Sequence, residues 1–552
     1  MTAVDVRAPG TTTGARGGDG AGPLVGTARL VRFALRRDRV RIPGWALGVG
    51  GTVVYFGVAI QAVYPDEASR QTRAAIMADP AGALMTGPGY GLEDYTFGVM
   101  LAAEMLGFLG VAAALMSIFL VVRHTRSEEE TGRAELVRSG VVGRYAPLSA
   151  ALVDVLVANL AVAAVLFLAL LGNGLETPDS AAFAAGVAMV GLVFGAVAAV
   201  TAQVGEHART ASGLAGAALG LAFVLRGVGD MQQRGGSALS WTSPIGWSQQ
   251  MRTYVDLRWW PLLLGGVLAA VLVAAAYLLA SRRDLGAGLV AAGRGRASAG
   301  PWLRGPVGLG ARLQRGSVLG WSFGMLVMAA LTGAMAEGIV DSFEAQPQLM
   351  EVFGAGLTGA DVVRGTLSAF LGFFAMAVAV FAVVSVHQLR RDEAEGRTGA
   401  VLATAVGRGR WLLASVAVTT GGAVVVLVVT GLALGGAAAA TTGDAGLVGE
   451  LALAGLVHLP VVLCFAGLAA LLHGLGAPAW PVWLVLVASI VVGLYGPLLD
   501  LPAAVVEHAP FALVPAVPAE SFEAGPVLGA LAVAVLLTGA AVAALRRRDL
   551  VA

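Results

Sequence analysis

Apolar stretches of about 20 residues recur along the whole chain, with short polar segments between them. A helix of about 20 apolar residues crosses the hydrocarbon core of a bilayer, and it satisfies its own backbone hydrogen bonds there. The pattern therefore predicts an all-α membrane protein with 12 transmembrane helices. The expected spans lie near residues 43–64, 99–122, 147–171, 181–203, 211–229, 260–280, 317–339, 366–386, 411–435, 447–472, 478–499 and 525–545.

The arginines indicate how these spans are oriented. All 36 basic residues are arginine, and 29 of them lie in segments that share one side of the membrane if both termini lie on that side. Six arginines fall on the other side and one lies within a span. Because cytoplasmic loops carry the excess of basic residues, we expect both termini in the cytoplasm.

The two halves of the chain resemble one another. When residues 122–144 are laid over residues 386–408, nine of 23 positions are identical. The sequence Arg-Arg-Asp-Leu also follows the sixth span, at 282–285, and the twelfth span, at 547–550. Each half holds an even number of expected spans, so both halves face the same way. We expect two parallel six-helix repeats, related by a pseudo-two-fold axis along the membrane normal.

This repeat sets the expected domain boundaries. Residues 1–23 are rich in Pro, Gly and Thr and predict a disordered cytoplasmic tail. The first six-helix half is expected at 24–285, and the second at 312–552. The Gly- and Arg-rich stretch 286–311 is expected to be the cytoplasmic linker between them.

An amphipathic segment precedes the first span. Its apolar residues fall on one side of a helix and its arginines on the other, which predicts an interfacial helix bound to anionic lipid. A simple basic flank of the first span is the alternative. The arginines concerned are Arg29, Arg32, Arg36 and Arg39, and a shorter counterpart is expected around Arg312 and Arg315.

Composition excludes several classes of protein. Hydrophobic residues make up 57% of the chain and charged residues 13%. Without lysine the chain has no Walker A lysine, so it cannot itself be a P-loop ATPase. Cys464 is the single cysteine and the six histidines show no metal-ligand spacing, so we expect no disulfide, metal site or other cofactor. A net charge of +1 gives no reason to expect nucleic acid as a partner.

The segment after the second span has the most informative charge pattern. Ser127 followed by Glu130 fits a capping box that would begin a short cytoplasmic helix, and Asp392 followed by Glu395 is expected to do the same in the second half. Such helices can dock on a partner protein through charge-assisted hydrogen bonds, although a solvated loop is the plainer alternative. The candidate docking residues are Glu128, Glu129, Glu130, Gly132, Arg133, Glu135, Asp392, Glu393, Glu395, Gly396 and Arg397.

Polar residues within spans are costly and face either a structural partner or a cavity. Structural pairing is the more frequent explanation, and a substrate path is the alternative. The candidates are Glu104, Asp154, Asn159, Arg226, Glu337 and Glu450. We expect His124 and His387, at the inner ends of spans, to face lipid headgroups or a partner protein.

Three segments carry a resemblance to a known family. They are the charged loop at 126–135 with its repeat at 393–397, the Ser-Pro-Ile-Gly-Trp run at 243–247, and the Arg-Arg-Asp-Leu-Gly-Ala-Gly run at 282–288. In these segments the chain resembles ABC-2 type permeases of ABC exporters, which have the type V fold. The resemblance is to the fused two-half form, typical of actinobacterial antibiotic and polyketide exporters.

The resemblance implies an architecture and a function. Each half would have an interfacial elbow helix, a coupling helix after its second span, and re-entrant outer helices before its sixth span, at 230–258 and 500–524. The chain would be the membrane subunit of an exporter of hydrophobic or amphiphilic compounds in a bacterial plasma membrane. Two copies of a separate ATP-binding-cassette ATPase would bind it and hydrolyse ATP, so the chain itself would not be an enzyme.

The second half departs from the family pattern, because Gly399 stands where the first half has Glu135. The two halves are therefore expected to couple unequally. The main alternative function is a proton-coupled secondary transporter, since 12 spans in two parallel halves also describe the major facilitator superfamily. The Gly-x-x-x-Asp-Arg loop motif of that superfamily is absent from the sequence.

Overall fold

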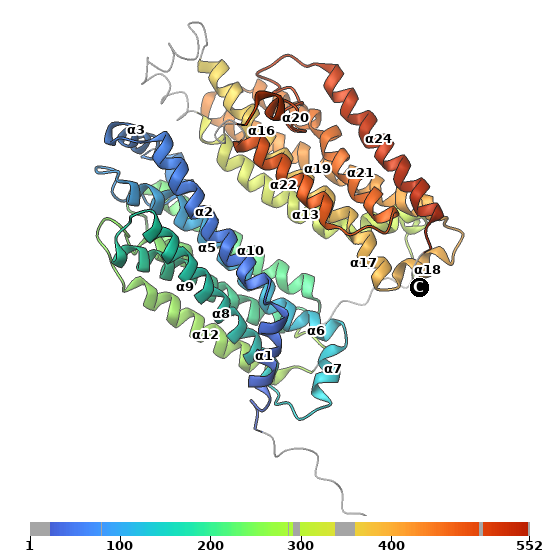
Figure 1. The fold of residues 1–552 in the computed structure, drawn as a ribbon, viewed down its shortest axis with the longest axis horizontal. Helices are drawn as coiled ribbons and strands as arrows, with labels where there is room; N and C mark the ends of the chain where they lie inside the picture. Colours follow the sequence, from blue (N-terminus) through green and yellow to red (C-terminus); the bar gives the residue numbers. More distant parts are fainter. Residues whose placement is uncertain are drawn as a thin grey trace, which may run out of the picture. The chain divides into compact units, whose positions relative to one another are not determined.

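The computed structural model describes residues 22–78, 80–284, 286–290, 298–336, 359–495 and 501–549. These residues form helices and connecting turns, and no strand occurs among them. The chain divides into two compact units, Met1–Gly293 and Arg294–Ala552, and each is described by itself (Figure 1). Most of the tail expected at 1–23 lies outside the described residues.

The described residues of the first unit contain six long apolar helices and several short ones, among them α1 at the position of the expected interfacial helix. They are α1 (Thr27–Arg37), α2 (Arg41–Val63), α3 (Glu67–Met77), α4 (Pro80–Thr86), α5 (Phe97–His124), α6 (Arg126–Glu130), α7 (Arg133–Arg138), α8 (Ala146–Gly172), α9 (Thr177–Val204), α10 (Ala208–Gln232), η1 (Ser240–Thr242), α11 (Pro244–Gln249) and α12 (Pro261–Arg282).

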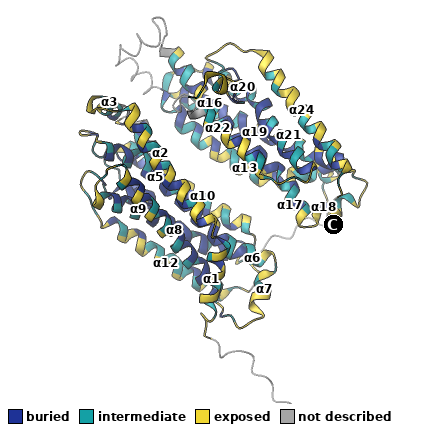
Figure 2. Cartoon of the chain, in the orientation of Figure 1, coloured by how far each residue is buried: buried dark blue, intermediate teal, exposed yellow. Residues whose placement is uncertain are grey.

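Helices α5 and α9 form the centre of the first unit. They are its most buried spans, whereas α12 lies at the edge with few of its residues buried (Figure 2). Small residues line the contact: Gly110 faces Val190, and Gly191 lies against Asn159 of α8. Close approach of backbones through small residues is how helices gain packing in a bilayer, where lipid and side chains are equally apolar.

A compact cap lies between α10 and α12. Its short helix α11 begins at Ser243, whose hydroxyl accepts a hydrogen bond from the backbone N–H of Ile245. Tyr254 has a positive φ of 64° and is held by Asp179, whose carboxylate accepts its N–H at 2.6 Å. Burial raises the pKa of Tyr254 to about 12. The segment expected at 230–258 is thus an ordered, largely buried structure.

The second unit repeats the order of long helices. Its elements are η2 (Pro301–Leu303), α13 (Pro306–Gly333), α16 (Gly359–Val386), α17 (Gln388–Ala394), α18 (Arg397–Leu402), α19 (Arg408–Thr442), α20 (Gly446–Val457), α21 (Leu459–Gly474), α22 (Trp480–Tyr495), α23 (Ala503–Glu507) and α24 (Ala524–Arg547). The span expected at 447–472 is interrupted at His458, because Pro460 lies in the first turn of α21 and has no N–H to donate.

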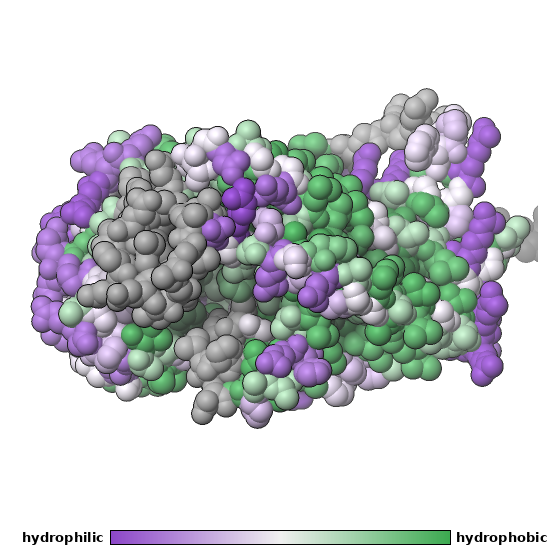
Figure 3. All heavy atoms as spheres, turned by 90° about the horizontal axis from the view of Figure 1, so that it is seen from above, coloured by the Kyte–Doolittle hydropathy of each residue, from purple (hydrophilic) through white to green (hydrophobic). Residues whose placement is uncertain are grey.

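Eleven helices of the described residues are long and apolar enough to cross a membrane, and α22 is an apolar helix of 16 residues at the remaining expected span. Apolar side chains cover much of the surface between the polar ends of the helices (Figure 3). The chain is therefore a multi-pass membrane protein, as predicted.

One local expectation is wrong. Arg312 and Arg315 do not form a separate interfacial helix, because α13 runs without a break from Pro306. At the beginning of the stretch expected to be the linker, the N–H groups of Leu289 and Val290 donate to the carbonyls of Gln203 and Val204 at the end of α9. These backbone hydrogen bonds hold the segment against the first unit.

Adjacent glycines on α19 provide a test of the packing. A Cβ at Gly435 would lie 2.4 Å from the carbonyl oxygen of Leu447, whereas a Cβ at Gly436 would meet nothing within 4 Å. We expect Gly435→Ala to lower the stability of the protein by about 1–3 kcal/mol through overpacking of α19 on α20. Gly436→Ala is the matched control, and its higher helix propensity is expected to leave stability unchanged or slightly raised. Thermal unfolding in detergent measures both, and equal melting temperatures for the two variants would contradict this packing.

Candidate functional site

The charged segment after α5 folds as two short helices with a glycine between them. Helix α6 follows a break at Thr125, and Gly132, with a φ of 71°, turns the chain into α7. Ser127 lies inside α6 and caps nothing, so the expected capping box is wrong. The glycine permits this turn because it lacks the Cβ that disfavours a positive φ.

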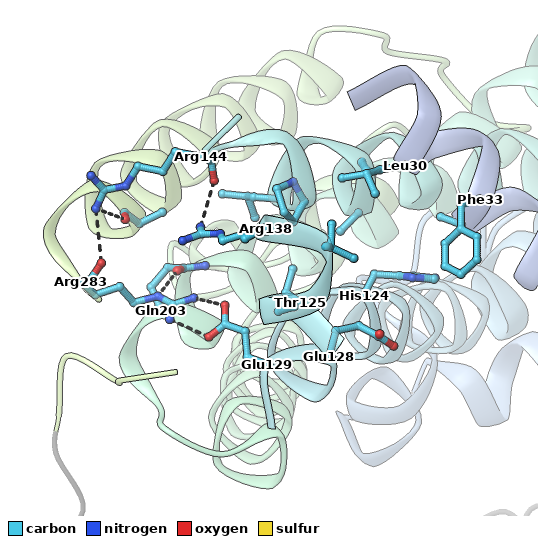
Figure 4. A pocket seen from close by; sticks show the side chains of 18 of the residues that line it. Leu30, Phe33, His124, Thr125, Glu128, Glu129, Arg138, Arg144, Gln203 and Arg283 are labelled. Atoms are coloured by element: carbon cyan, nitrogen blue, oxygen red, sulfur yellow. Dashed lines mark hydrogen bonds and ion pairs between the residues drawn. The ribbon is translucent and has the colours of Figure 1, made fainter. Parts of the chain in front are cut away.

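Glu129 is the centre of an ion-pair cluster. Its two carboxylate oxygens accept hydrogen bonds from Arg283, just after α12, at 2.5 and 2.7 Å (Figure 4). Arg126 donates to the same carboxylate at 2.8 Å, and its fully buried guanidinium also donates to the carbonyls of Ala202 and Ala287. Bidentate pairing of this kind fixes geometry as well as charge. We call the pair Glu129–Arg283 the clamp of the first unit.

The neighbouring glutamates also bind within the unit. Glu128 pairs with Arg37 of α1 at 2.5 Å, and Glu130 accepts the backbone N–H of Ala208, the first residue of α10, at 3.0 Å. Helix α6 is thus joined to three other helices. Glu128 and Glu129 are therefore directed toward their own unit, whereas Glu130 remains exposed.

The second unit has the same arrangement at equivalent positions. Glu393 pairs with Arg548 at 2.5 Å, and we call this pair the clamp of the second unit. Gly396 has a φ of 73° and turns the chain from α17 into α18. Asp392 is buried in α17 and pairs with Arg397 at 2.7 Å, as Glu128 does with Arg133 at 3.6 Å, so the capping role expected for Asp392 is wrong.

The exposed sides of α7 and α18 differ. In the first unit Leu136 is 76% and Val141 75% exposed, beside the exposed Glu135. In the second unit the positions that align with Leu136 and Val141 are Ala400 and Ala405. The first unit therefore presents large apolar side chains at this surface, where the second presents small ones.

A cavity of about 110 Å³ lies under α7 in the first unit. Phe33 of α1 and Leu148 of α8 supply apolar walls, and Arg138 and Arg144 supply charge (Figure 4). Arg138 donates to the carbonyl of Arg144 at 3.3 Å, and burial lowers its pKa. Helix α1 lies along this cavity with Arg29, Arg32 and Arg36 exposed, and Arg39, which follows the helix, is exposed as well.

Four of the polar residues expected within spans have structural partners. Glu104 pairs with Arg73 of α3 through two hydrogen bonds of 3.1 Å, and this pairing raises the pKa of Arg73 although burial acts to lower it. Asn159 donates to Ser117 at 2.8 Å, and Arg226 lies 3.4 Å from Asp230. Glu450 pairs likewise, with Arg364 at 2.9 Å. Glu337 lies outside the described residues.

Asp154 differs from these residues. It is fully buried on α8, and neither of its carboxylate oxygens has a hydrogen-bond partner among the described residues. Its nearest charged neighbour is His124, with 3.6 Å between Nε2 and Oδ2. His124 also contacts Asp38, so the expectation that His124 faces headgroups or a partner is wrong. The sequence marks His124 and Asp154 singly, but no pattern in it predicts that they meet Asp38, because the three residues are far apart in the chain.

Each unit also carries an apolar groove along its first long helix. In the first unit a groove of about 780 Å³ runs between α2 and α5, with Gly44 and Gly48 on its floor and Trp45 and Phe108 among its walls. In the second unit a groove of about 440 Å³ follows Gly316, Gly320 and Gly324 of α13. None of the described polar candidates for a substrate path lines either groove.

The clamp of the first unit can be tested by a double-mutant cycle. Glu129 and Arg283 are each about nine-tenths buried, so removing one partner leaves the other charge uncompensated. We expect Glu129→Gln or Arg283→Gln alone to lower the free energy of unfolding by about 3 kcal/mol. The double variant should lose less than the sum of the two, and equilibrium unfolding in mixed micelles measures the difference. Additive effects would contradict the coupling of these two residues.

Comparison with known proteins agrees with this architecture. The family model described as "Multidrug efflux system permease Rv1217c, C-terminal domain" matches residues 28–279 and 303–546. The multidrug efflux system permease protein Rv1217c of Mycobacterium tuberculosis is 39% identical over 536 residues, which cover 95% of this chain and 95% of that protein. Similarity over nearly the full length of both chains leaves one conclusion: this chain belongs to the family of the multidrug efflux system permease Rv1217c.

Proposed function

We propose that this chain is the membrane subunit of an ATP-driven ABC exporter that moves hydrophobic or amphiphilic, drug-like compounds out of a bacterial cell. The single observation that carries the proposal is the clamp, which occurs at the same place in both units. In each unit a glutamate of the short helix after the second long helix binds an arginine that follows the last one. Because this ion pair joins the short helix to the end of the last long helix, a movement of the short helix would be transmitted to the spans.

The clamp changes the role proposed for the glutamates. Glu129 and Glu393 would position the two coupling segments, rather than bind the partner themselves. The contact with the partner would fall to the exposed side chains of α7 and α18, including Glu135, Leu136 and Val141 in the first unit. The smaller side chains of α18 would make the second contact weaker, so that the two units couple unequally.

The energy source follows from composition and the paired segments. The chain has no lysine, so ATP would be bound and hydrolysed on a separate ATP-binding-cassette subunit. Two coupling segments on one chain would bind two copies of that subunit. The same reasoning supports an ABC-2 type permease with the type V fold, two parallel six-helix repeats and both termini in the cytoplasm.

The class of substrate follows from the grooves. Their walls are formed by aromatic and aliphatic side chains, and glycines keep their floors open. Surfaces of this kind bind ligands mainly through burial of apolar area. The relative in Mycobacterium tuberculosis is named a multidrug efflux permease, which agrees with a broad range of hydrophobic substrates such as antibiotics and polyketides.

Stoichiometry tests the proposed partner. Native mass spectrometry of the purified complex should give one 55.7 kDa chain with two ATPase chains. The isolated chain should hydrolyse no ATP above background. A stable one-to-one complex, or proton-driven transport by the chain alone, would contradict the proposal and favour a secondary transporter.

The clamp also predicts a loss of coupling. We expect the double variant Glu129→Gln, Glu393→Gln to export several-fold less substrate for each ATP hydrolysed in proteoliposomes with the ATPase, because loosened coupling segments no longer move the spans. Glu93→Gln is the matched control: Glu93 forms an exposed ion pair with Arg234 outside the coupling segments, and such pairs contribute little. An unchanged ratio of transport to hydrolysis in a correctly inserted double variant would remove the clamp from the mechanism.

A further inference from the structure

Three ionisable side chains from separate helices meet in the first unit. Asp38 lies between α1 and α2, His124 is the last residue of α5, and Asp154 lies on α8. One ligand atom of each, an imidazole nitrogen or a carboxylate oxygen, lies within 4.8 Å of the others. Asp38 and Asp154 are fully buried.

The protein alone does not satisfy this cluster. The Nε2 of His124 contacts Oδ2 of Asp38 and is 3.6 Å from Oδ2 of Asp154, which is too long for a hydrogen bond. A single N–H can donate to only one of the two carboxylates. Both oxygens of Asp154 are left buried without a donor among the residues that the structure describes. A buried carboxylate in this state requires a cation or a proton.

Neighbouring arginines orient the carboxylate of Asp38 within this cluster. Arg41 donates to the other oxygen of Asp38, Oδ1, at 3.0 Å, and the Nε of Arg123 lies 3.7 Å from it. Oδ2 of Asp38 is therefore left for His124 and for whatever lies between His124 and Asp154. This resembles the outer contacts that orient metal-binding carboxylates in proteins.

We propose that Asp38, His124 and Asp154 form a binding site for one divalent transition-metal ion, of which Zn²⁺ is the best match. One imidazole nitrogen and two carboxylate oxygens are ligands that Zn²⁺ takes, and water would complete its coordination. Two carboxylates balance the charge of the ion. His124 also lines the cavity under α7 (Figure 4).

The site belongs to the first unit alone. The position in the second half that aligns with His124 is Gln388, and the one that aligns with Asp154 is Val418. One ion is therefore expected for each chain. It would bind α1, α5 and α8 together directly before α6, so it would stiffen the base of one coupling segment and not the other. This inference is independent of the exporter's energy source and substrate.

Metal content provides the test. The full chain is purified without a polyhistidine tag, and a chelator is used to remove bound metal. The protein is then dialysed against a buffer in which Zn²⁺ is the only divalent metal ion, and its zinc content is measured by elemental mass spectrometry. We expect one equivalent of zinc in the wild type and a rise in melting temperature on binding. His124→Gln and Asp154→Asn should each lose that equivalent. Because these variants can fail to fold, Arg41→Gln is the second test. It keeps all three proposed ligands but removes the hydrogen bond that orients Asp38, so we expect the affinity for Zn²⁺ to fall about tenfold or more.

His473→Gln is the matched control. His473 is also buried at the inner end of a span, but it faces a single carboxylate, that of Glu393, at 3.8 Å. This variant should retain the zinc of the wild type. Zinc in the wild type no higher than in His124→Gln and Asp154→Asn would overturn the proposal. A second result would also overturn it: Asp154→Asn has a higher melting temperature than the wild type, and zinc does not change the melting temperature of the wild type. The cluster would then hold a proton on Asp154 and not a metal ion.

Discussion

The ion pair between Glu129 and Arg283 is the constraint on which the packing around α6 in the first unit depends. A carboxylate withdrawn from water needs a cation, and besides Arg126 of α6 itself that cation is Arg283, which brings the end of α12 against α6. Glu128 and Glu130 add α1 and the start of α10 to the same assembly. The second unit solves the same problem with Glu393 and Arg548, although its surrounding residues differ.

This constraint separates two tasks within one short segment. The acidic residues of α6 hold the segment to its own unit, while α7 exposes Leu136 beside charged side chains such as Glu135. An external load on α7 would therefore reach α12 through fixed hydrogen bonds rather than through a flexible loop. Family membership confirms the expected permease subunit and argues against an enzyme. A short helix held firmly to the ends of the spans is consistent with a permease.

Within the spans, polarity serves structure more than passage. Glu104 and Asn159 each have a partner on another helix, and Arg226 pairs with Asp230 one turn further along α10, as intramembrane polar groups usually do. The two grooves are lined mainly by apolar side chains, and the glycines on their floors have no side chain to fill them. Asp154 is the exception, since it is buried without a hydrogen bond to any of the described residues and lies beside His124 and Asp38.

The sequence by itself determined the all-helical membrane fold, because hydrophobic length alone decides which segments can cross a bilayer. It also determined the two places, near 129 and 283, where the halves are most alike, although not that these places touch. Tertiary structure decided which way Glu129 points, and it brought together Asp38, His124 and Asp154. Local pattern carries no record of such contacts, because they depend on how separate helices pack and on which buried charges that packing leaves to be neutralised.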